Sequence, residues 1–152
     1  MKKRIELLSP AGDLERLKVT LLYGADAVYI GGQHYSLRAN ASNFSIDEIK
    51  EACDFAHSLG KKVYLTLNIV FHNEDIKGVE DYIKDVANAG IDAFIVSDPF
   101  IIKYIKTNFP SVEVHLSTQN STSNIEAVKY FKDQGIDRVV LARELSLCEI
   151  EK

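Results

Sequence analysis

A short pattern recurs three times in this chain of 152 residues, and it limits the fold more than any other feature. Residues 24–30 (GADAVYI), 90–96 (GIDAFIV) and 135–141 (GIDRVVL) share a glycine, a small or apolar residue, an aspartate and a mostly apolar run, and residues 59–65 are a looser copy. Glycine often ends a helix because it adopts the left-handed conformation at low cost. An apolar run two or three residues later is typical of a strand. The repeat therefore predicts successive helix–turn–strand units.

Amphipathic helices fill the intervals between these strands, because apolar residues recur there at helical spacing. Capping boxes that begin at Ser45, Ser123 and Ser146 mark helix starts, and Asp98 followed by Pro99 marks another. The strands are predicted near residues 5–9, 26–31, 62–68, 93–97, 112–117 and 138–142.

Strict alternation of strand and helix predicts a parallel α/β sheet. A doubly wound sheet would carry a GxGxxG loop after its first strand, whereas residues 9–12 read SPAG. We therefore predict a single domain, residues 1–152, with a parallel (β/α) fold of the TIM-barrel type. It is incomplete, with about six of the eight βα units of a closed barrel. A helix that starts at Ser146, so close to Lys152, leads us to expect the N-terminal portion of a larger domain.

Composition narrows the class of protein. The hydrophobic fraction is 46% and the formal net charge is -4, which argues against nucleic-acid binding through bulk charge but leaves room for a local basic patch. No apolar run is long enough to span a membrane. The two cysteines, Cys53 and Cys148, are far apart, so the sequence predicts no metal site and no disulfide framework, and we expect a cytoplasmic protein.

Candidate site residues follow the predicted strands, at the carboxyl end where barrels place their active sites. Arg38 lies in a connection longer than most βα loops, and its planar guanidinium suits a carboxylate or phosphate. A solvated surface loop is the alternative. Arg38 and His115 are the catalytic candidates, without an assigned role. The predicted substrate-binding residues are Arg38, Asn43, Asn68, Ser117, Gln119 and Arg143.

Side-chain alternation predicts an unusually polar barrel interior. Strand residues alternate between two faces, and in the third and fifth strands one face is entirely aliphatic. That face must contact the helices, so the other set should face the lumen. A ligand could satisfy these polar groups, or they could satisfy one another. The predicted lumen residues are Tyr64, Thr66, Asn68, Glu113, His115 and Ser117.

Several blocks, in order along the chain, resemble the collagenase-like peptidase family U32. They are residues 7–12 (LLSPAG), 24–32 (GADAVYIGG), Arg38 with Asn43 and Phe44, 64–68 (YLTLN), 117–120 (STQN) and 138–146 (RVVLARELS). The resemblance implies a TIM barrel of several hundred residues and a protease by name. Similar proteins are linked instead to hydroxylation of tRNA or rRNA bases, with prephenate as a partner metabolite in the tRNA case, or to hydroxylation of ubiquinone.

Three functions remain open under this resemblance. The chain could be a fragment of a collagenase-like peptidase, part of an RNA- or ubiquinone-hydroxylating protein, or a non-catalytic fragment that only folds or assembles. The sequence has no HExxH or GxSxG motif. Several relatives bind an iron–sulfur cluster, which the resemblance places on residues beyond Lys152, so no cofactor is expected in this chain. A peptide or RNA substrate is expected only for the full-length protein, and this chain alone is expected to be inactive. Open strand edges predict self-association of the chain.

Replacing Arg38 tests its assignment to the site. In the intact protein, Arg38→Ala should weaken the binding of an anionic ligand by about 1.5–3 kcal/mol, because a charge-assisted hydrogen bond is lost. Isothermal titration calorimetry measures this change. An unchanged affinity would assign Arg38 to a solvated surface loop.

Overall fold

The computed structural model describes residues 5–36 and 43–151. One sheet contains six strands in the order β1-β2-β3-β4-β5-β6, and every neighbouring pair is parallel. The strands are β1 (Leu8–Pro10), β2 (Ala27–Gly31), β3 (Lys62–Leu67), β4 (Ala93–Val96), β5 (Glu113–Leu116) and β6 (Arg138–Val139). The helices are α1 (Leu14–Leu22), α2 (Ile46–Ser58), α3 (Val79–Asn88), α4 (Pro99–Asn108), α5 (Ile125–Asp133) and α6 (Leu147–Ile150), and a 3₁₀ helix, η1 (Thr118–Asn120), follows β5.

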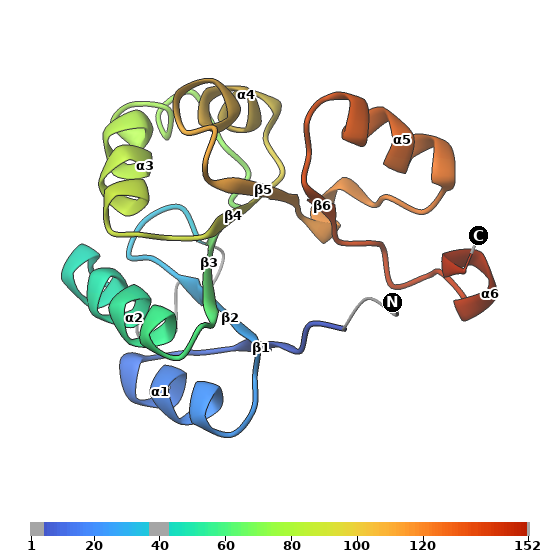
Figure 1. The fold of residues 1–152 in the computed structure, drawn as a ribbon. Coiled ribbons are helices and arrows are strands. Elements are labelled where there is room, and N and C mark those ends of the chain that lie inside the picture. The colour runs from blue at the N-terminus through green and yellow to red at the C-terminus, as the bar shows by residue number, and fades with distance from the viewer. Residues whose placement is uncertain (1–4, 37–42, 152) are drawn as a thin grey trace.

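The strands form an arc that is covered on its outer side by α1 to α5 (Figure 1). The arc opens between β1 and β6, and α6 lies beyond β6, apart from the helical layer (Figure 1). This arrangement confirms the predicted parallel, incomplete barrel. Within the described residues, no helix has the length and apolar character to cross a membrane.

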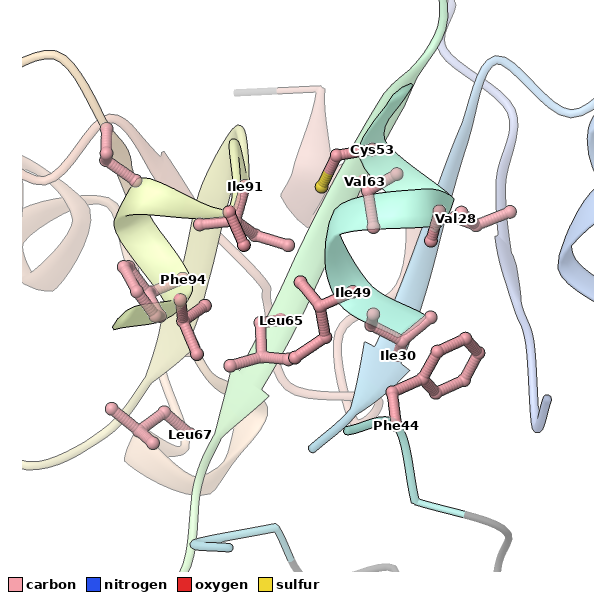
Figure 2. Packing of buried hydrophobic residues seen from close by; sticks show 14 of the residues in the cluster. Val28, Ile30, Phe44, Ile49, Cys53, Val63, Leu65, Leu67, Ile91 and Phe94 are labelled. Carbon is pink, nitrogen blue, oxygen red and sulfur yellow. The ribbon is translucent and has the colours of Figure 1, made fainter. Parts of the chain in front are cut away.

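The main core lies between the sheet and the helical layer. Ile49 and Cys53 of α2 pack onto the outward-facing residues of β2 and β3, among them Ile30, Val63 and Leu65, and all five are buried (Figure 2). Cys53 is therefore a core residue. Burial raises the pKa of its thiol to about 12, so the sulfur is uncharged near neutrality.

The repeated pattern corresponds to a repeated turn at the start of β2, β4 and β6. Gly24, Gly90 and Gly135 have φ angles of 118°, 100° and 82°, in the left-handed region that favours glycine. The residue after each glycine (Ala25, Ile91 and Ile136) is buried in the main core. The turn thus requires glycine first and a small or apolar residue second, which explains two of the three shared positions.

The third shared position, the aspartate, holds the preceding strand. In each copy one carboxylate oxygen accepts the backbone N–H of a residue at the amino end of the strand before it. Such bonds to a charged acceptor are stronger than those between neutral groups. The three bonds are Leu7 N–H to Asp26 at 2.9 Å, Val63 N–H to Asp92 at 2.8 Å and Val114 N–H to Asp137 at 2.8 Å.

Most of the predicted helix starts are confirmed, and one is wrong. Ser45 and Ser146 form capping boxes, and Asp98 caps α4 through its side chain. The box predicted at Ser123 does not form. Asn124 caps α5 instead, with its Oδ1 accepting the N–H of Ala127 at 2.9 Å, because an asparagine in extended conformation satisfies the same free amides.

Replacing Asp92 tests the aspartate bond. Asp92→Ala should lower the free energy of unfolding by roughly 2 kcal/mol, because the Val63 N–H loses a charged acceptor. Asp92→Asn should lose less, since one oxygen acceptor remains. Urea unfolding followed by circular dichroism gives these values. Asp85→Ala, at an exposed position of α3, is the control and should change stability by less than about 0.5 kcal/mol. Equal losses for Asp92→Ala and Asp85→Ala would contradict this account.

Candidate functional site

The inner face of the sheet carries polar side chains, as the alternation predicted. Tyr64, Thr66 and His115 are buried there, whereas Val63, Leu65 and Val114 belong to the outer core. Inner-face residues form a separate small cluster, which includes Ala27, Tyr64, Ala93 and Ile95. The lumen therefore mixes aromatic, aliphatic and hydrogen-bonding groups.

A charged network closes the amino-terminal end of this lumen. Glu6, just before β1, accepts hydrogen bonds from the Tyr64 hydroxyl at 2.9 and 3.0 Å and forms an ion pair with Arg138 of β6. The Arg138 guanidinium lies 5.5 Å from the centre of the Tyr64 ring. The bond to Arg138 lowers the pKa of Glu6 despite its burial. Glu6 thus connects the first and last strands of the arc.

His115 extends this network across the inner face. Its ring lies edge-on to Tyr64, with centroids 4.7 Å apart, and its Nε2 is 2.8 Å from Glu113 Oε2. Burial lowers the pKa of His115, so a neutral ring donates its Nε2–H to the carboxylate. Burial alone would raise the pKa of Glu113, but the contacts with His115 and Lys62 outweigh this effect, and the pKa is lowered. These contacts favour the alternative that lumen groups satisfy one another. A catalytic role for His115 stays a prediction.

At the carboxyl end of β2 two successive glycines allow close packing, Gly31 against Ser36 and Asn43 and Gly32 against Tyr82 of α3 in the outer core. A Cβ on Gly31 would lie 2.8 Å from Ser36 Oγ, and a Cβ on Gly32 would lie 1.8 Å from the Tyr82 hydroxyl. Ser36 Oγ is also 3.1 Å from Thr66 Oγ1 of β3. Asn43, predicted for the site, lies here with a buried Oδ1 that has no hydrogen-bond partner among the described residues.

The ends of β4 and β5 add further uncharged polar groups to this rim. Ser117 directly follows β5 and contacts Gln119 of η1, with 3.4 Å between Ser117 Oγ and Gln119 Oε1. Asn120 donates to the Ser97 carbonyl at 3.4 Å. The Oδ1 of Asn120 and the hydroxyl of Thr122 are buried and lack partners among the described residues. The structure thus places Ser117 and Gln119 in contact, together with Ser97, Asn120 and Thr122 in the same segment pair, and a binding role for these residues stays a prediction.

Of the remaining predicted residues, two follow strands of the sheet and one lies outside the described part of the chain. Asn68 follows β3, and its backbone N–H donates to the Tyr35 carbonyl at 3.1 Å. Arg143 follows β6 and is exposed. Arg38 lies outside the described residues, so its place in the site stays a prediction.

Sequence reasoning missed Tyr35, which organises the rim between β2 and β3. Tyr35 has a φ of 61°, rare for a residue with a large side chain. Its carbonyl accepts the N–H groups of Asn68 and Ile69, and its ring stacks on Phe71, with centroids 5.6 Å apart. Strain at one residue of this kind is typical of functional regions. Nothing in the sequence pattern signals it.

Within the described residues, no group of three or more histidine, cysteine or acidic side chains could hold a metal ion. Cys148, on α6, is exposed, and Cys53 is in the core. The rim as described therefore offers amide and hydroxyl groups for hydrogen bonding to a ligand.

Comparison with known proteins identifies the family. The sequence profile described as Peptidase family U32 matches residues 12–152. The chain belongs to peptidase family U32.

Similar members of the U32 family are named for RNA hydroxylation. The chain is 55% identical, over 99% of its length, to tRNA hydroxylation protein P1 of Bacillus subtilis, of which it spans 36%. It is 42% identical, over 97% of its length, to the 23S rRNA 5-hydroxycytidine C2501 synthase of Escherichia coli, of which it spans 22%. A Methanocaldococcus jannaschii protein named as an uncharacterized protease is 41% identical over all of this chain, which spans 37% of it. The chain thus covers about a third or less of these U32 relatives.

Solved structures agree on the fold. A U32 peptidase structure superposes with a TM-score of 0.73 at 14% identity, covering 93% of this chain and 60% of that one. A phosphonopyruvate hydrolase superposes with a TM-score of 0.62 at 14% identity, covering 97% of this chain and 62% of that one. At such low identity these matches establish the fold alone.

The bond between Glu6 and Arg138 makes a pH-dependent contribution to stability. Because folding lowers the pKa of Glu6, the bond stabilises the protein above the ordinary pKa of glutamate and loses this effect as the pH falls through the lowered value. Glu6→Gln should therefore cost about 1–2 kcal/mol near neutral pH and progressively less below about pH 4. Urea unfolding at several pH values tests this, with exposed Glu80→Gln as the control. A loss that does not depend on pH would contradict it.

Proposed function

We propose that this chain is part of an RNA-hydroxylation protein, in which it positions the RNA base to be modified. The observation that carries this proposal is the 55% identity to tRNA hydroxylation protein P1, which extends over 99% of the chain. A relative named for hydroxylation of an rRNA cytidine is also 42% identical. One of these relatives is named for tRNA and the other for rRNA, and both match this chain over nearly its whole length. A shared role in binding the base to be modified is consistent with this.

The peptidase alternative has less support from the described side chains. A cysteine protease needs a thiolate beside a histidine, but Cys53 is a core residue whose pKa is raised to about 12. Cys148 is exposed on α6. His115 is buried, and its Nε2 is bonded to Glu113 rather than to a serine or cysteine. Among the described residues, no nucleophile–base pair of the kind that proteases use is present.

The rim suits a base better than it suits a peptide cleavage reaction. Asn43, Ser117 and Gln119 offer amide and hydroxyl groups, which pair with the donors and acceptors on a base edge. An enzyme must also take a base out of its stack to reach a ring atom. Hydroxylation requires an oxidant. We assign its binding to parts of the full-length protein beyond the described residues.

Complementation tests the proposed function. The intact protein, expressed in a bacterial strain that lacks its own tRNA hydroxylation proteins, should restore a tRNA nucleoside one oxygen atom heavier than its parent, as measured by mass spectrometry of digested tRNA. Gln119→Ala should reduce its yield, because a hydrogen-bonding group at the rim is lost. Exposed Asn88→Ala, at the end of α3, is the control for loss of an amide.

Two results would reject the proposal. One is the absence of any heavier tRNA or rRNA nucleoside although the protein is expressed. The other is hydrolysis of gelatin by the purified intact protein at a rate that follows protein concentration, which would support the peptidase alternative.

A further inference from the structure

A groove separates α4 from α5 on the outer side of the barrel. It has a volume of about 340 Å³ and starts at the carboxyl rim, where Ser97, Pro99 and Asn120 line it. The two helices stand apart at this place, beyond β5 (Figure 1). The volume lies within the range of ligand sites in proteins. The groove is thus a neighbour of the rim but distinct from the lumen.

Apolar and aromatic side chains form the walls of this groove. Ile102 of α4, Phe131 of α5 and the buried Ile136 line it. Tyr130 also lines it and is 60% exposed, and its ring lies edge-on to Phe131 with centroids 5.3 Å apart. None of the residues of α5 is buried, unlike those of α1 to α4. The ring of Tyr130 is therefore available to a planar ligand.

The charge at this groove is positive. Its described lining includes Lys103 and Lys106 and no carboxylate. Lys106 is 2.9 Å from Asp137, whose carboxylate also holds the Val114 amide, so Lys106 serves the fold. Lys103 is exposed and has no ion-pair partner within the described part of the chain. Although the net charge of the chain is -4, Lys103 lies beside the aromatic side chains of the groove without an ion-pair partner among the described residues.

An acceptor oxygen at the same groove lacks a donor. Asn120 lines the groove and donates its amide N–H to the Ser97 carbonyl, which fixes the orientation of the side chain. Its Oδ1 is buried and has no partner among the described residues. A buried acceptor without a donor costs free energy. A ligand with an N–H group would remove that cost.

We propose that the α4–α5 groove binds a nucleotide of the RNA substrate, next to the nucleotide that occupies the rim. The base lies against Tyr130 and Phe131, an N–H of the base edge donates to Asn120, and the phosphate contacts Lys103. A nucleotide combines the planar ring, the N–H donor and the negative charge that these groups require. The inference rests on the proposed function for its RNA, and it adds a binding subsite outside the barrel mouth.

RNA binding by the intact protein tests this subsite. The probe is a fluorescein-labelled single-stranded RNA of about 12 nucleotides, a length within the site sizes of single-strand binders. Tyr130→Ala should weaken binding about tenfold, whereas Tyr130→Phe, which keeps the ring, should bind almost as the parent does. Lys103→Ala should reduce the slope of log affinity against log salt by about 0.7, the value for one phosphate contact. Lys84→Ala, an exposed lysine of α3, is the matched control and should leave the slope unchanged.

The outcomes separate this inference from the proposed function. If the parent binds RNA and all these variants bind equally well, the groove is not a subsite, while the hydroxylation proposal stands. If the parent binds no RNA and forms no hydroxylated nucleoside, both are overturned. Uridine monophosphate serves as a competitor. If it binds at Tyr130 while RNA does not, the ligand is a free nucleotide and the assignment to RNA is wrong.

Discussion

The aspartates of the Gly-x-Asp turns form hydrogen bonds to the strands beside their own, and the register of the sheet depends on these bonds. The side chain of Asp92 accepts the N–H of Val63 in β3, and its carbonyl accepts the N–H of Glu113 in β5. Asp26 makes the equivalent bonds to Leu7 and Lys62. A one-residue slip would turn the polar inner face toward the helices. The aspartate therefore fixes which side chains enter the lumen and which enter the outer core.

The fixed register also determines where the candidate site lies. With the amino ends of neighbouring strands held level, their carboxyl ends meet at one rim, where Asn43, Ser117, Gln119 and Asn120 collect. The opposite end is occupied by the bonds among Glu6, Tyr64 and Arg138, which satisfy the charges there. The two ends thus have separate roles. One holds the first and last strands together, and the other carries the buried Oδ1 atoms of Asn43 and Asn120, which have no hydrogen-bond partner among the described residues.

Local signals in the sequence predicted much of this structure. The glycine repeat predicted successive helix–turn–strand units in a parallel sheet, and alternation in β3 and β5 placed Thr66 and His115 on the inner face, where the structure has them. Features that depend on contacts between distant residues could not be predicted from local sequence patterns. Glu6 and Arg138 are 132 residues apart, and nothing in either local segment indicates the pair. The left-handed Tyr35 and the partnerless Asn120 depend on tertiary packing, which periodicity does not report. The cap of α5 was misassigned by one position, since Ser123 and Asn124 are both good cap residues.

Native-state hydrogen exchange is the most direct test of the aspartate-held register. The amides of Leu7, Val63 and Val114 lie at the amino ends of strands, where exchange is usually fast because strand ends fray. The account predicts that these three amides exchange as slowly as amides within β3 and β4. Exchange at the rate of an open loop, under conditions where the strand interiors stay protected, would show that the aspartates do not hold the strands and would contradict the account.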